Sequence, residues 1–415
     1  MKERNIICVD LKSFFASCEC LERNLDPFTT PLVVCNPERN DSITLAVTPF
    51  LKRYGVSGRT RVYNLPKNIN IKKVPPRMNL YIQKSKEVIE TYLEFISSED
   101  IHIYSIDEVF LDVTNYLNMY KTDVYSLALK ILNRIKEKNG LTATAGIGPN
   151  MLLAKVAMDI EAKHTKDNIA YWTYNDVKTK LWNITPLSKM WGIGSRMEKN
   201  LNKLKIYTIG DLANYNKLLL KEKFGVIGEE LWNHANGIDE STIKDYKKDA
   251  KDKSYSHSQI LYKDYDDKNI SIIIKEMSKV LAHRLRENKK NTSVVSLHIT
   301  YSKNIGGGFS HMNKLESPTD NEKIIESICL NLFDRFYEDL PIRKVGISVG
   351  RLSDNTGVQL NLFENYEEVR TTNQMNNTLD AISNKFGKNS IIPASALLDD
   401  STLIERNKKI GGHNA

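Results

Sequence analysis

The chain has 415 residues, of which 27% are charged and 41% are hydrophobic, and its formal net charge is +8 at pH 7. This length predicts roughly two to four domains, and the composition excludes a disordered chain. The positive charge is compatible with a polyanionic partner. No apolar run approaches the length of a membrane span, and the charged first residues predict no signal peptide. The five cysteines form no CxxC pair, so we expect reduced thiols and a cytoplasmic protein.

The N-terminal segment combines a buried strand with an acidic residue. Residues 6–9 form a continuous apolar run, which is typical of a strand buried on both faces. Asp10 follows this strand, and Ser13 is expected to cap the next helix. An acid at the end of a buried strand is well placed to act as a metal ligand.

A basic cluster follows the strand expected at residues 31–35. Lys52 and Arg53 lie in a helix-like segment that ends at Gly55, and Arg59 and Arg61 come soon after. These residues could clamp a triphosphate. The alternative is a solvated basic surface.

Two adjacent acids stand in a predicted hairpin. Residues 101–105 and 109–113 are rich in β-forming residues and flank Ile106, Asp107 and Glu108. Adjacent carboxylates at the edge of a core repel each other unless a cation neutralises them, and Mg²⁺ or Mn²⁺ would suit them. Together with Asp10 they could hold two divalent ions about 4 Å apart. The alternative is an ordinary solvated acidic turn.

Helical and extended patterns around the hairpin predict one α+β domain. We expect helices at residues 81–96, 123–139 and 150–162 and a strand at 142–147. The order of strand, helix, hairpin, helix and strand is that of a ferredoxin-like fold.

The character of the chain changes near residue 171. Gly192, Ile193, Gly194 and Ser195 open a predicted helix-hairpin-helix, in which exposed backbone N–H groups could hold a DNA phosphate without reading sequence. The alternative is a simple turn.

A second βαββαβ unit follows a highly charged segment, residues 244–253, that is predicted to be a linker. We expect strands at 256–262, 294–301, 310–315 and 344–352 and helices at 271–287 and 321–337. Candidate phosphate contacts in this unit are Lys303, His311, Lys314, Arg343 and Arg351.

A short peptide near the C-terminus fits a partner's hydrophobic groove. Gln359, Leu360, Leu362 and Phe363 follow a turn and have polar sequence on both sides, which disfavours the alternative of a buried strand end. Beyond them we expect one helix, at residues 375–386, and we assign no role to residues 364–415.

Two motifs carry a resemblance to a known family. Asp10-x-x-x-Phe14-Phe15-Ala16-Ser17-Cys18-Glu19, with Ser105-Ile-Asp-Glu-Val-Phe-Leu-Asp112 downstream, resembles the Y-family translesion DNA polymerases of the DinB and UmuC type. The similarity runs over essentially the whole chain and is greatest to the UV-damage-repair branch of Gram-positive bacteria and their mobile elements. It implies a low-fidelity, template-directed polymerase that acts in DNA repair and the SOS response.

The resemblance also implies how the domains are arranged. It predicts an α+β fold with a ferredoxin-like palm, inserted small fingers, a helix-hairpin-helix thumb and a separate βαββαβ little finger. The expected boundaries are 1–24 and 78–166 for the palm, 25–77 for the fingers, 167–240 for the thumb, 241–255 for the linker, 256–354 for the little finger and 355–415 for the tail, with a clamp-binding peptide at 359–363.

Roles for single residues follow from the same resemblance. Two Mg²⁺ ions, with Mn²⁺ as the alternative, are expected at Asp10, Leu11, Asp107 and Glu108, and Glu108 is the catalytic acid. Phe15 is implied to be the steric gate beneath the sugar of the incoming dNTP, with Phe14 beside it, although both could be core residues. Lys52 and Lys163 are implied to bind the triphosphate.

The implied partners are primer–template DNA, dNTP, the bacterial sliding clamp through residues 359–363, and a recombinase filament as an accessory factor. The protein is expected to be a monomer without membrane attachment. One rival hypothesis is a nucleotide or diguanylate cyclase, which the helix-hairpin-helix and the clamp peptide oppose. The other is a non-catalytic scaffold that binds DNA and the clamp, which the three carboxylates oppose because they would repel phosphates without metal.

Overall fold

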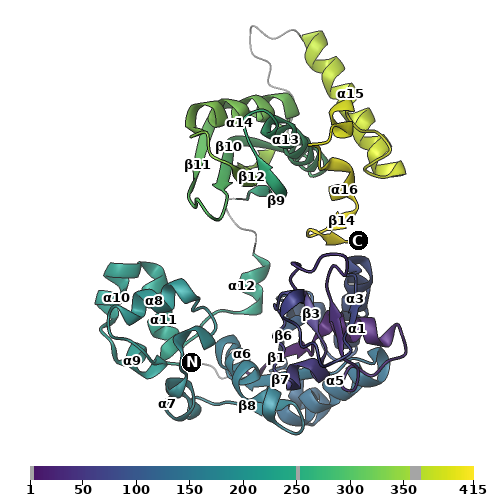
Figure 1. Cartoon of the computed structure of the whole chain (residues 1–415). Coiled ribbons are helices and arrows are strands. Elements are labelled where there is room, and N and C mark those ends of the chain that lie inside the picture. The colour runs from purple at the N-terminus through teal and green to yellow at the C-terminus, as the bar shows by residue number, and fades with distance from the viewer. Residues whose placement is uncertain (1–3, 249–252, 356–365) are drawn as a thin grey trace. The chain divides into compact units, whose positions relative to one another are not determined.

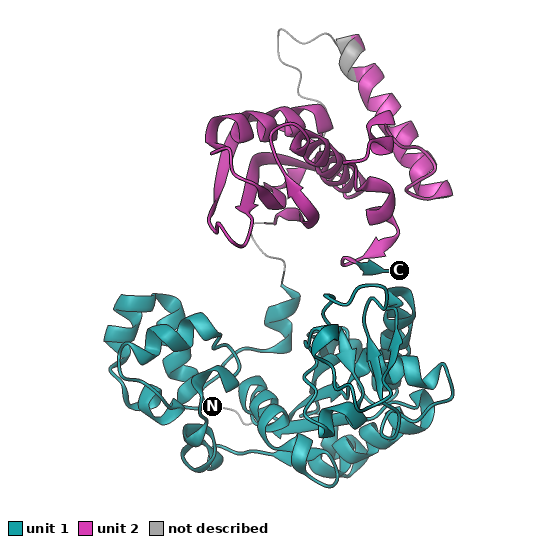
Figure 2. Ribbon diagram, viewed as in Figure 1, with its two compact units in different colours: residues 1–248, 413–415 teal, residues 249–412 magenta. Residues whose placement is uncertain are grey.

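The computed structural model describes residues 4–248, 253–355 and 366–415 and divides the chain into two compact units (Figure 2). One unit comprises residues 1–248 with 413–415, and the other comprises residues 249–412. Each unit is described by itself. Within the described ranges, no helix has the length and apolar character that a membrane span requires.

A five-stranded sheet is the centre of the first unit (Figure 1). Its strand order is β5-β6-β1-β7-β8, and all neighbours are antiparallel except β7 and β8. The central position of β1 explains why the sequence of this strand is apolar on both faces. The strands are β1 (Ile6–Leu11), β5 (Ile101–Ile103), β6 (Glu108–Asp112), β7 (Ala143–Gly148) and β8 (Ile169–Tyr171).

Helices cover both faces of this sheet. Ile7 and Val9 point into the core formed with α1 (Phe14–Leu21), α3 (Met78–Leu93) and α5 (Val124–Asn139). The alternate strand residues Ile6 and Cys8 face α6 (Met151–Ile160) on the other side. This arrangement confirms the predicted order of strand, helix, hairpin, helix and strand. The short α4 (Leu117–Tyr120) precedes α5.

Ser13 differs from its expected role. It stands before α1 but adopts a left-handed backbone with φ 51°, and its side chain makes no capping hydrogen bond. The prediction that the Ser13 side chain caps the helix is therefore wrong.

A small three-stranded sheet, with the order β3-β2-β4, forms the insertion after α1. Its own core includes Val33, Val47 and Leu51. The elements are β2 (Leu32–Val34), β3 (Ala46–Val47), α2 (Pro49–Arg53), a 3₁₀ turn (Val62–Asn64) and β4 (Lys72–Val74).

A helical region follows β8 and is anchored to α6. The Asn150 side chain donates to the Gly237 carbonyl at 2.8 Å, and the buried Asp239 carboxylate accepts from the Leu152 N–H at 3.0 Å. Asp239 thus satisfies a free N–H group in the first turn of α6. The helices are α7 (Asp176–Thr179), α8 (Ser195–Asn202), α9 (Ile209–Asn214), α10 (Lys217–Phe224) and α11 (Val226–Ala235).

The segment expected to be a linker is partly helical. Residues Ile243–Lys247 form α12, which begins with a capping box between Thr242 and Asp245. Tyr246 stacks on His102 with ring centroids 4.4 Å apart. The sequence did not predict this short helix, which packs on the edge of the sheet at the start of the segment predicted to be a linker. Residues 249–252 lie outside the described ranges.

The second unit contains the expected βαββαβ sequence of elements. Its antiparallel sheet has the order β11-β10-β12-β9. The elements are β9 (Tyr255–Tyr265), α13 (Ile270–Glu287), β10 (Lys290–Tyr301), β11 (Gly308–Thr319), α14 (Glu322–Phe336), β12 (Ile342–Gly350) and β13 (Ser353–Asp354).

The two faces of this second sheet differ. Val295, Leu297 and Ile299 of β10 are buried against α13 and α14, so the alternate residues, among them His298 and Thr300, lie on the opposite, uncovered face. We call this second face the open face.

His311 lies opposite Leu297 in the strand register, so its side chain is on the helix-covered side of the sheet. Its ring stacks on Phe336 of α14 with centroids 3.6 Å apart. This placement opposes its prediction as a phosphate contact.

Residues 366–412 fold against α13 (Figure 1), whereas residues 413–415 are assigned to the first unit. Arg286 makes two hydrogen bonds to Asp380, at 2.6 and 3.0 Å. Ser401 and Thr402 both donate to the buried carboxylate of Glu276. These residues therefore belong to the second unit, and the helix expected at 375–386 is longer than predicted. The elements are α15 (Tyr366–Phe386), a 3₁₀ turn (Ala394–Leu397), α16 (Leu403–Asn407), β14 (Lys409–Ile410) and β15 (His413–Asn414).

Candidate active site

Strand pairing brings the three predicted acids to one end of β1 and β6. Asp10 lies opposite Glu108 in the antiparallel register. The Leu11 N–H donates to the Asp107 carbonyl at 2.9 Å. Asp10 lies within β1 rather than after it, and Glu108 begins β6 rather than standing in the turn. Residues separated by almost a hundred positions thus become neighbours.

The electrostatic environment of Asp10 favours a bound cation. Its pKa is raised to about 7, first by burial and then by the negative charges of Asp107 and Glu108, against the opposing effect of Lys163 and Lys155. Asp107 is held by Ser105, whose hydroxyl donates to its carboxylate at 2.7 Å. Hard divalent ions prefer carboxylate oxygens, so this donor set fits Mg²⁺ or Mn²⁺.

Glu108 is turned toward a different partner. Its carboxylate lies 2.8 Å from the Lys155 ammonium group and accepts a hydrogen bond from the Cys8 thiol at 3.2 Å. Burial raises the pKa of Cys8 well above its usual value, so the thiol stays protonated and donates. Within the described part of the chain, no group of three or more His, Cys, Asp or Glu side chains is arranged to hold a metal. The backbone brings the acids together, while the Glu108 side chain is paired with Lys155.

Lysines surround the acids. Partial burial lowers the pKa of Lys52, with Lys163 adding to the effect and Asp10 and Asp107 opposing it. Burial also lowers the pKa of Lys12, and the charges of Lys52 and Lys163 act in the same direction. These three lysines and two carboxylates are therefore close enough to act on one another electrostatically. Such a cluster suits a triphosphate with its metal ions.

The two adjacent phenylalanines have different surroundings. Phe14 is only 2% exposed and belongs to the core. Phe15 is half-buried and stacks on Tyr81 with ring centroids 4.4 Å apart. Phe15, not Phe14, therefore keeps a surface that a sugar could contact.

The predicted helix-hairpin-helix has an exposed N-terminus at α8. Gly192 has φ +91°, a left-handed conformation that favours glycine, and Gly194 stands just before the first helical residue, Ser195. All three are exposed, whereas Ile193 between the glycines is buried. Free N–H groups at this end of the helix can donate hydrogen bonds to a phosphate.

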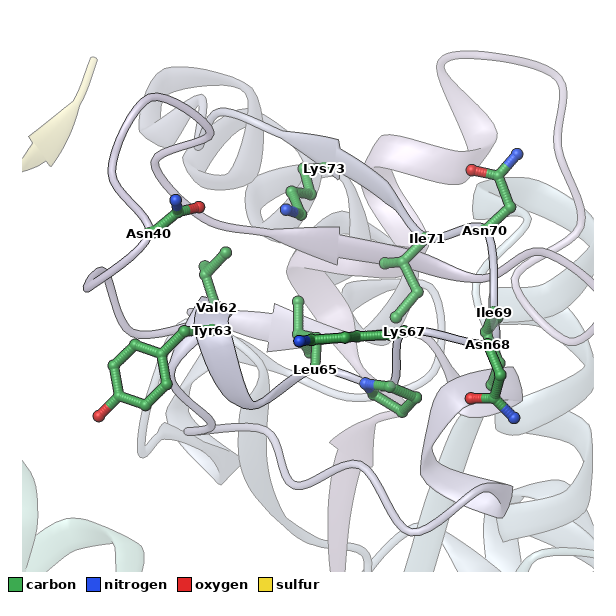
Figure 3. Close-up of a pocket in the computed structure, with 11 residues that line it drawn as sticks. Asn40, Val62, Tyr63, Leu65, Lys67, Asn68, Ile69, Asn70, Ile71 and Lys73 are labelled. Atoms are coloured by element: carbon green, nitrogen blue, oxygen red, sulfur yellow. The ribbon is translucent and has the colours of Figure 1, made fainter.

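A separate pocket of about 770 Å³ lies in the inserted small sheet. Figure 3 shows the Lys67 side chain running across the middle of its lining residues and the Tyr63 ring pointing away from them. None of its described lining residues is acidic. Its described lining therefore offers no carboxylate that could bind a metal ion.

Sequence reasoning missed a row of charge pairs along α6 and the 3₁₀ turn that follows it (Ala162–His164). Lys155, Asp159 and Lys163 stand four residues apart, and Asp159 lies 2.9 Å from each lysine. The i, i+4 spacing was a usable signal for pairs on one helix face. The contact of Lys155 with Glu108 depends on how α6 packs on the sheet, and no local pattern indicates it. Lys12 was missed as well.

Comparison with known proteins decides the family. Residues 9–159 match the impB/mucB/samB family, residues 252–362 match its C-terminal domain, and residues 174–206 match the IMS family HHH motif. A Bacillus subtilis protein named for UV-damage repair, UvrX, is 39% identical over 99% of this chain and 98% of its own. The chain belongs to the impB/mucB/samB family. The resemblance to Y-family translesion polymerases is thereby confirmed.

Further members of this family carry polymerase names. DNA polymerase IV 2 of Bacillus subtilis is 34% identical over 100% of this chain and 99% of its own. DNA polymerase IV of Clostridium acetobutylicum is 32% identical over 95% of this chain and 98% of its own.

A solved structure supports the fold. A Y-family DNA polymerase chimera of Dbh and Dpo4 superposes with a TM-score of 0.67 at 21% identity, covering 85% of this chain and 100% of that chain. The predicted α+β fold with palm, thumb and little finger is confirmed.

Proposed function

We propose that this chain is a template-directed DNA polymerase of the translesion type. It transfers a nucleotidyl group from a dNTP to the 3′-hydroxyl of a primer on template DNA. The observation that carries the proposal is the pairing of Asp10 with Glu108 beside Asp107, within electrostatic reach of Lys52 and Lys163. The full-length relatives named DNA polymerase IV support the same reaction.

The acids would hold the metal ions of this reaction. Asp10, Asp107 and Glu108, with Leu11 as a further contact, would bind two Mg²⁺ ions, or Mn²⁺ in their place. When bound, these ions activate the primer hydroxyl and neutralise charge on the leaving pyrophosphate. Lys155 neutralises Glu108 until the carboxylate turns toward Asp10.

The surrounding side chains position the dNTP. Lys52, Lys163 and Lys12 bind the triphosphate through their positive charges. The ring of Phe15, braced by Tyr81, lies beneath the sugar and excludes a ribonucleotide by contact with its 2′-hydroxyl. The small fingers insertion leaves the nascent base pair loosely enclosed, which fits low fidelity and a role in the DNA-damage (SOS) response.

DNA is held by contacts that do not read sequence. The N–H groups at Gly192, Gly194 and Ser195 bind one backbone phosphate. In the second unit, serines and one glycine leave the backbone of the open face accessible to a DNA strand. These are Ser256, Ser258, Ser296, Ser310, Gly346 and Ser348.

Recruitment uses the peptide at residues 359–363, which lies outside the described residues. Gln359, Leu360, Leu362 and Phe363 bind the groove of the sliding clamp. We propose a recombinase filament as a further candidate partner. Replacing Leu362 and Phe363 by alanine should abolish stimulation of primer extension by the clamp while extension without the clamp is unchanged.

Primer extension tests the catalytic assignment. We expect the wild type to extend a primer on undamaged template with Mg²⁺ and dNTPs, and Glu108→Gln to lose at least a hundredfold in rate, about 3 kcal/mol of transition-state stabilisation. Asp112→Asn, at the other end of β6, is the matched control and should stay active. Retained extension by Glu108→Gln would refute the metal site.

The alternative function is a non-catalytic scaffold that binds DNA and the clamp. The observation in its favour is the Glu108–Lys155 ion pair, which holds one acid away from the others. Wild-type protein that binds primer–template and clamp but extends no primer, with Mg²⁺ or Mn²⁺, would establish the scaffold.

A further inference from the structure

The C-terminal segment encloses a second pocket that polymerase chemistry does not use. It has a volume of about 470 Å³, within the size range of small-molecule sites. It is lined by β9, α13, α15 and α16, all in the second unit. We call it the α13–α16 pocket, and its lining residues include His257, Lys279, Lys388, Arg406 and Lys409.

This pocket lies on the helix-covered side of the sheet. His257 is opposite Ile347 in the strand register, and Gln259 is opposite Val345. Ile347 and Val345 are buried against the helices. The pocket therefore lies mainly on the side of the sheet opposite the open face to which we assign DNA, and Ser258 of the edge strand β9 belongs to both.

Its walls carry an excess of positive charge. The charged lining residues include four cations and one acid, Asp380. That acid is already neutralised, because it accepts two hydrogen bonds from Arg286 and lies 2.9 Å from His283. Among the described residues, neither Lys279 nor Lys388 has a carboxylate within 4 Å. Like charges around one cavity repel each other unless an anion enters.

Two buried nitrogen atoms in the lining have no partner. Arg406 is held in place by Gln259, which accepts from its Nη1 at 2.9 Å, and by the buried Glu276 carboxylate 3.7 Å from the same nitrogen. Its buried Nη2 has no hydrogen-bond acceptor among the described residues. The buried Nε2 of His257 has none either. A buried polar atom without a partner is costly and indicates a group that binds there. Burial and the neighbouring charge of Arg406 lower the pKa of His257 to about 4, in keeping with a strongly positive site.

The remaining wall is apolar. Val280, Ile391 and Leu403 line the same cavity. A guanidinium group with nearby lysines matches a phosphate, and an apolar wall matches an organic group attached to it. A bare inorganic anion would leave most of this volume unused.

We propose that the α13–α16 pocket binds a small organic phosphate of the mononucleotide class. The phosphate lies at Arg406, His257, Lys279 and Lys388, and the organic group lies on Val280, Ile391 and Leu403. The same phosphate chemistry could be presented by the end of a DNA strand. The position of the pocket on the covered side of the sheet favours a free nucleotide.

Calorimetric titration of the full chain in EDTA tests the proposal. The probes are 2′-deoxyadenosine 5′-monophosphate, uncharged deoxyadenosine, inorganic phosphate and a 5′-phosphorylated thymidine trinucleotide. We expect the monophosphate to bind, and to bind about tenfold or more weakly to Lys279→Gln/Lys388→Gln and to Arg406→Gln. Lys408→Ala, an exposed neighbour paired with Glu405, is the matched control and should bind as the wild type does.

The double lysine variant guards against misfolding, because it removes no hydrogen bond that holds α16, whereas Arg406→Gln does. A second readout is the imidazole NMR titration of His257, whose pKa should rise when the monophosphate is present and stay unchanged with deoxyadenosine. Equal affinity of the wild type and the double variant for the monophosphate would overturn the proposal, as would failure of all probes to bind. If only the trinucleotide binds, the proposal of a free nucleotide is overturned and the site is assigned to a DNA end.

Discussion

Asp10 is a residue whose titration should govern metal binding. Its pKa of about 7 means that its proton competes with a divalent ion in the neutral range. We expect the Mg²⁺ concentration for half-maximal primer extension to fall as pH rises through 7, by up to about tenfold per pH unit below the pKa. Extension rates measured across Mg²⁺ and pH series check this, and an unchanged half-maximal concentration below and above pH 7 would contradict it.

The raised pKa of Asp10 also makes the stability of the folded protein depend on pH. Because the folded-state pKa of Asp10 lies above its usual 3.8, its contribution to the stability of the metal-free protein is present below that value and is lost as pH rises to about 7. Asp10→Asn should therefore raise the unfolding temperature in EDTA above pH 7, and the difference from wild type should vanish near pH 4. Mg²⁺ should stabilise the wild type only.

Lys155 offers a second test among single residues. Its side chain is 10% exposed and neutralises the buried Glu108, so Lys155→Met leaves an unpaired buried charge and should lower the free energy of unfolding by about 3–5 kcal/mol in EDTA. Mg²⁺ should restore part of the loss by giving Glu108 a new partner. The matched control is Lys163→Met. The Lys163 side chain is 43% exposed and pairs only with Asp159 among the described residues, so we expect a small effect. Equal losses in both variants, measured by urea unfolding, would contradict this.

How far the sequence predicts single residues depends on where their partners lie. Asp10, Asp107 and Glu108 stand in two short motifs. Their proximity could therefore be predicted from these motifs and from the pairing of the two strands that carry them. Lys155 and Lys12 gain their roles only from contacts between elements far apart in the chain. The orientation of Glu108 toward Lys155 likewise depends on how α6 packs on the sheet, and a local motif does not predict it.

At the scale of elements, α6 packs so closely on β7 that the interface has no room for an added side-chain atom. A Cβ atom on Gly146 would lie 2.0 Å from the Ala154 carbonyl oxygen and 2.4 Å from the Met158 backbone nitrogen, so the helix backbone itself would have to move. Gly146→Ala should lower the free energy of unfolding by about 1–3 kcal/mol and reduce primer extension, since α6 carries Lys155. Gly58→Ala, where nothing lies within 4 Å, is the control and should be nearly neutral in urea unfolding.

Periodicity predicted most elements because each buries one face or one stripe. The strands of both sheets and the helices α5, α13 and α14 carry such patterns within their own sequences. The helix α12 was missed although its capping signal, Thr242 with Asp245 three residues later, is local. The high charge of the surrounding residues, which is typical of a linker, obscures that signal.

At the scale of the whole molecule, the division into two units falls after Lys248, inside the segment predicted to be a linker. The packing of residues 366–412 on α13 could not be predicted from sequence. It depends on single ion pairs and hydrogen bonds, such as Arg286 with Asp380 and Thr402 with Glu276. These join positions about a hundred residues apart and leave no periodic signal.

Removing lysines from the two faces of the second sheet should change the salt dependence of DNA binding differently. Lys314 and Lys344 stand opposite Val294 and Thr300 in the register, which places both lysines on the open face. Each phosphate contact contributes about 0.9 to the slope of log affinity against log salt. We therefore expect Lys314→Ala and Lys344→Ala each to flatten that slope by about one, and the double variant Lys314→Ala/Lys344→Ala by about two, uniformly across DNA sequences.

The control for this measurement is Lys279→Gln/Lys388→Gln, which removes the same number of charges from the covered side. Net charge changes equally in the two double variants, so a general electrostatic effect would flatten both slopes alike. Flattening confined to the open-face pair would show that position, and not net charge, decides which lysines meet the phosphates. Fluorescence anisotropy of labelled primer–template over a salt series measures both slopes, and a loss confined to the covered pair would reverse the assignment of the DNA-binding face.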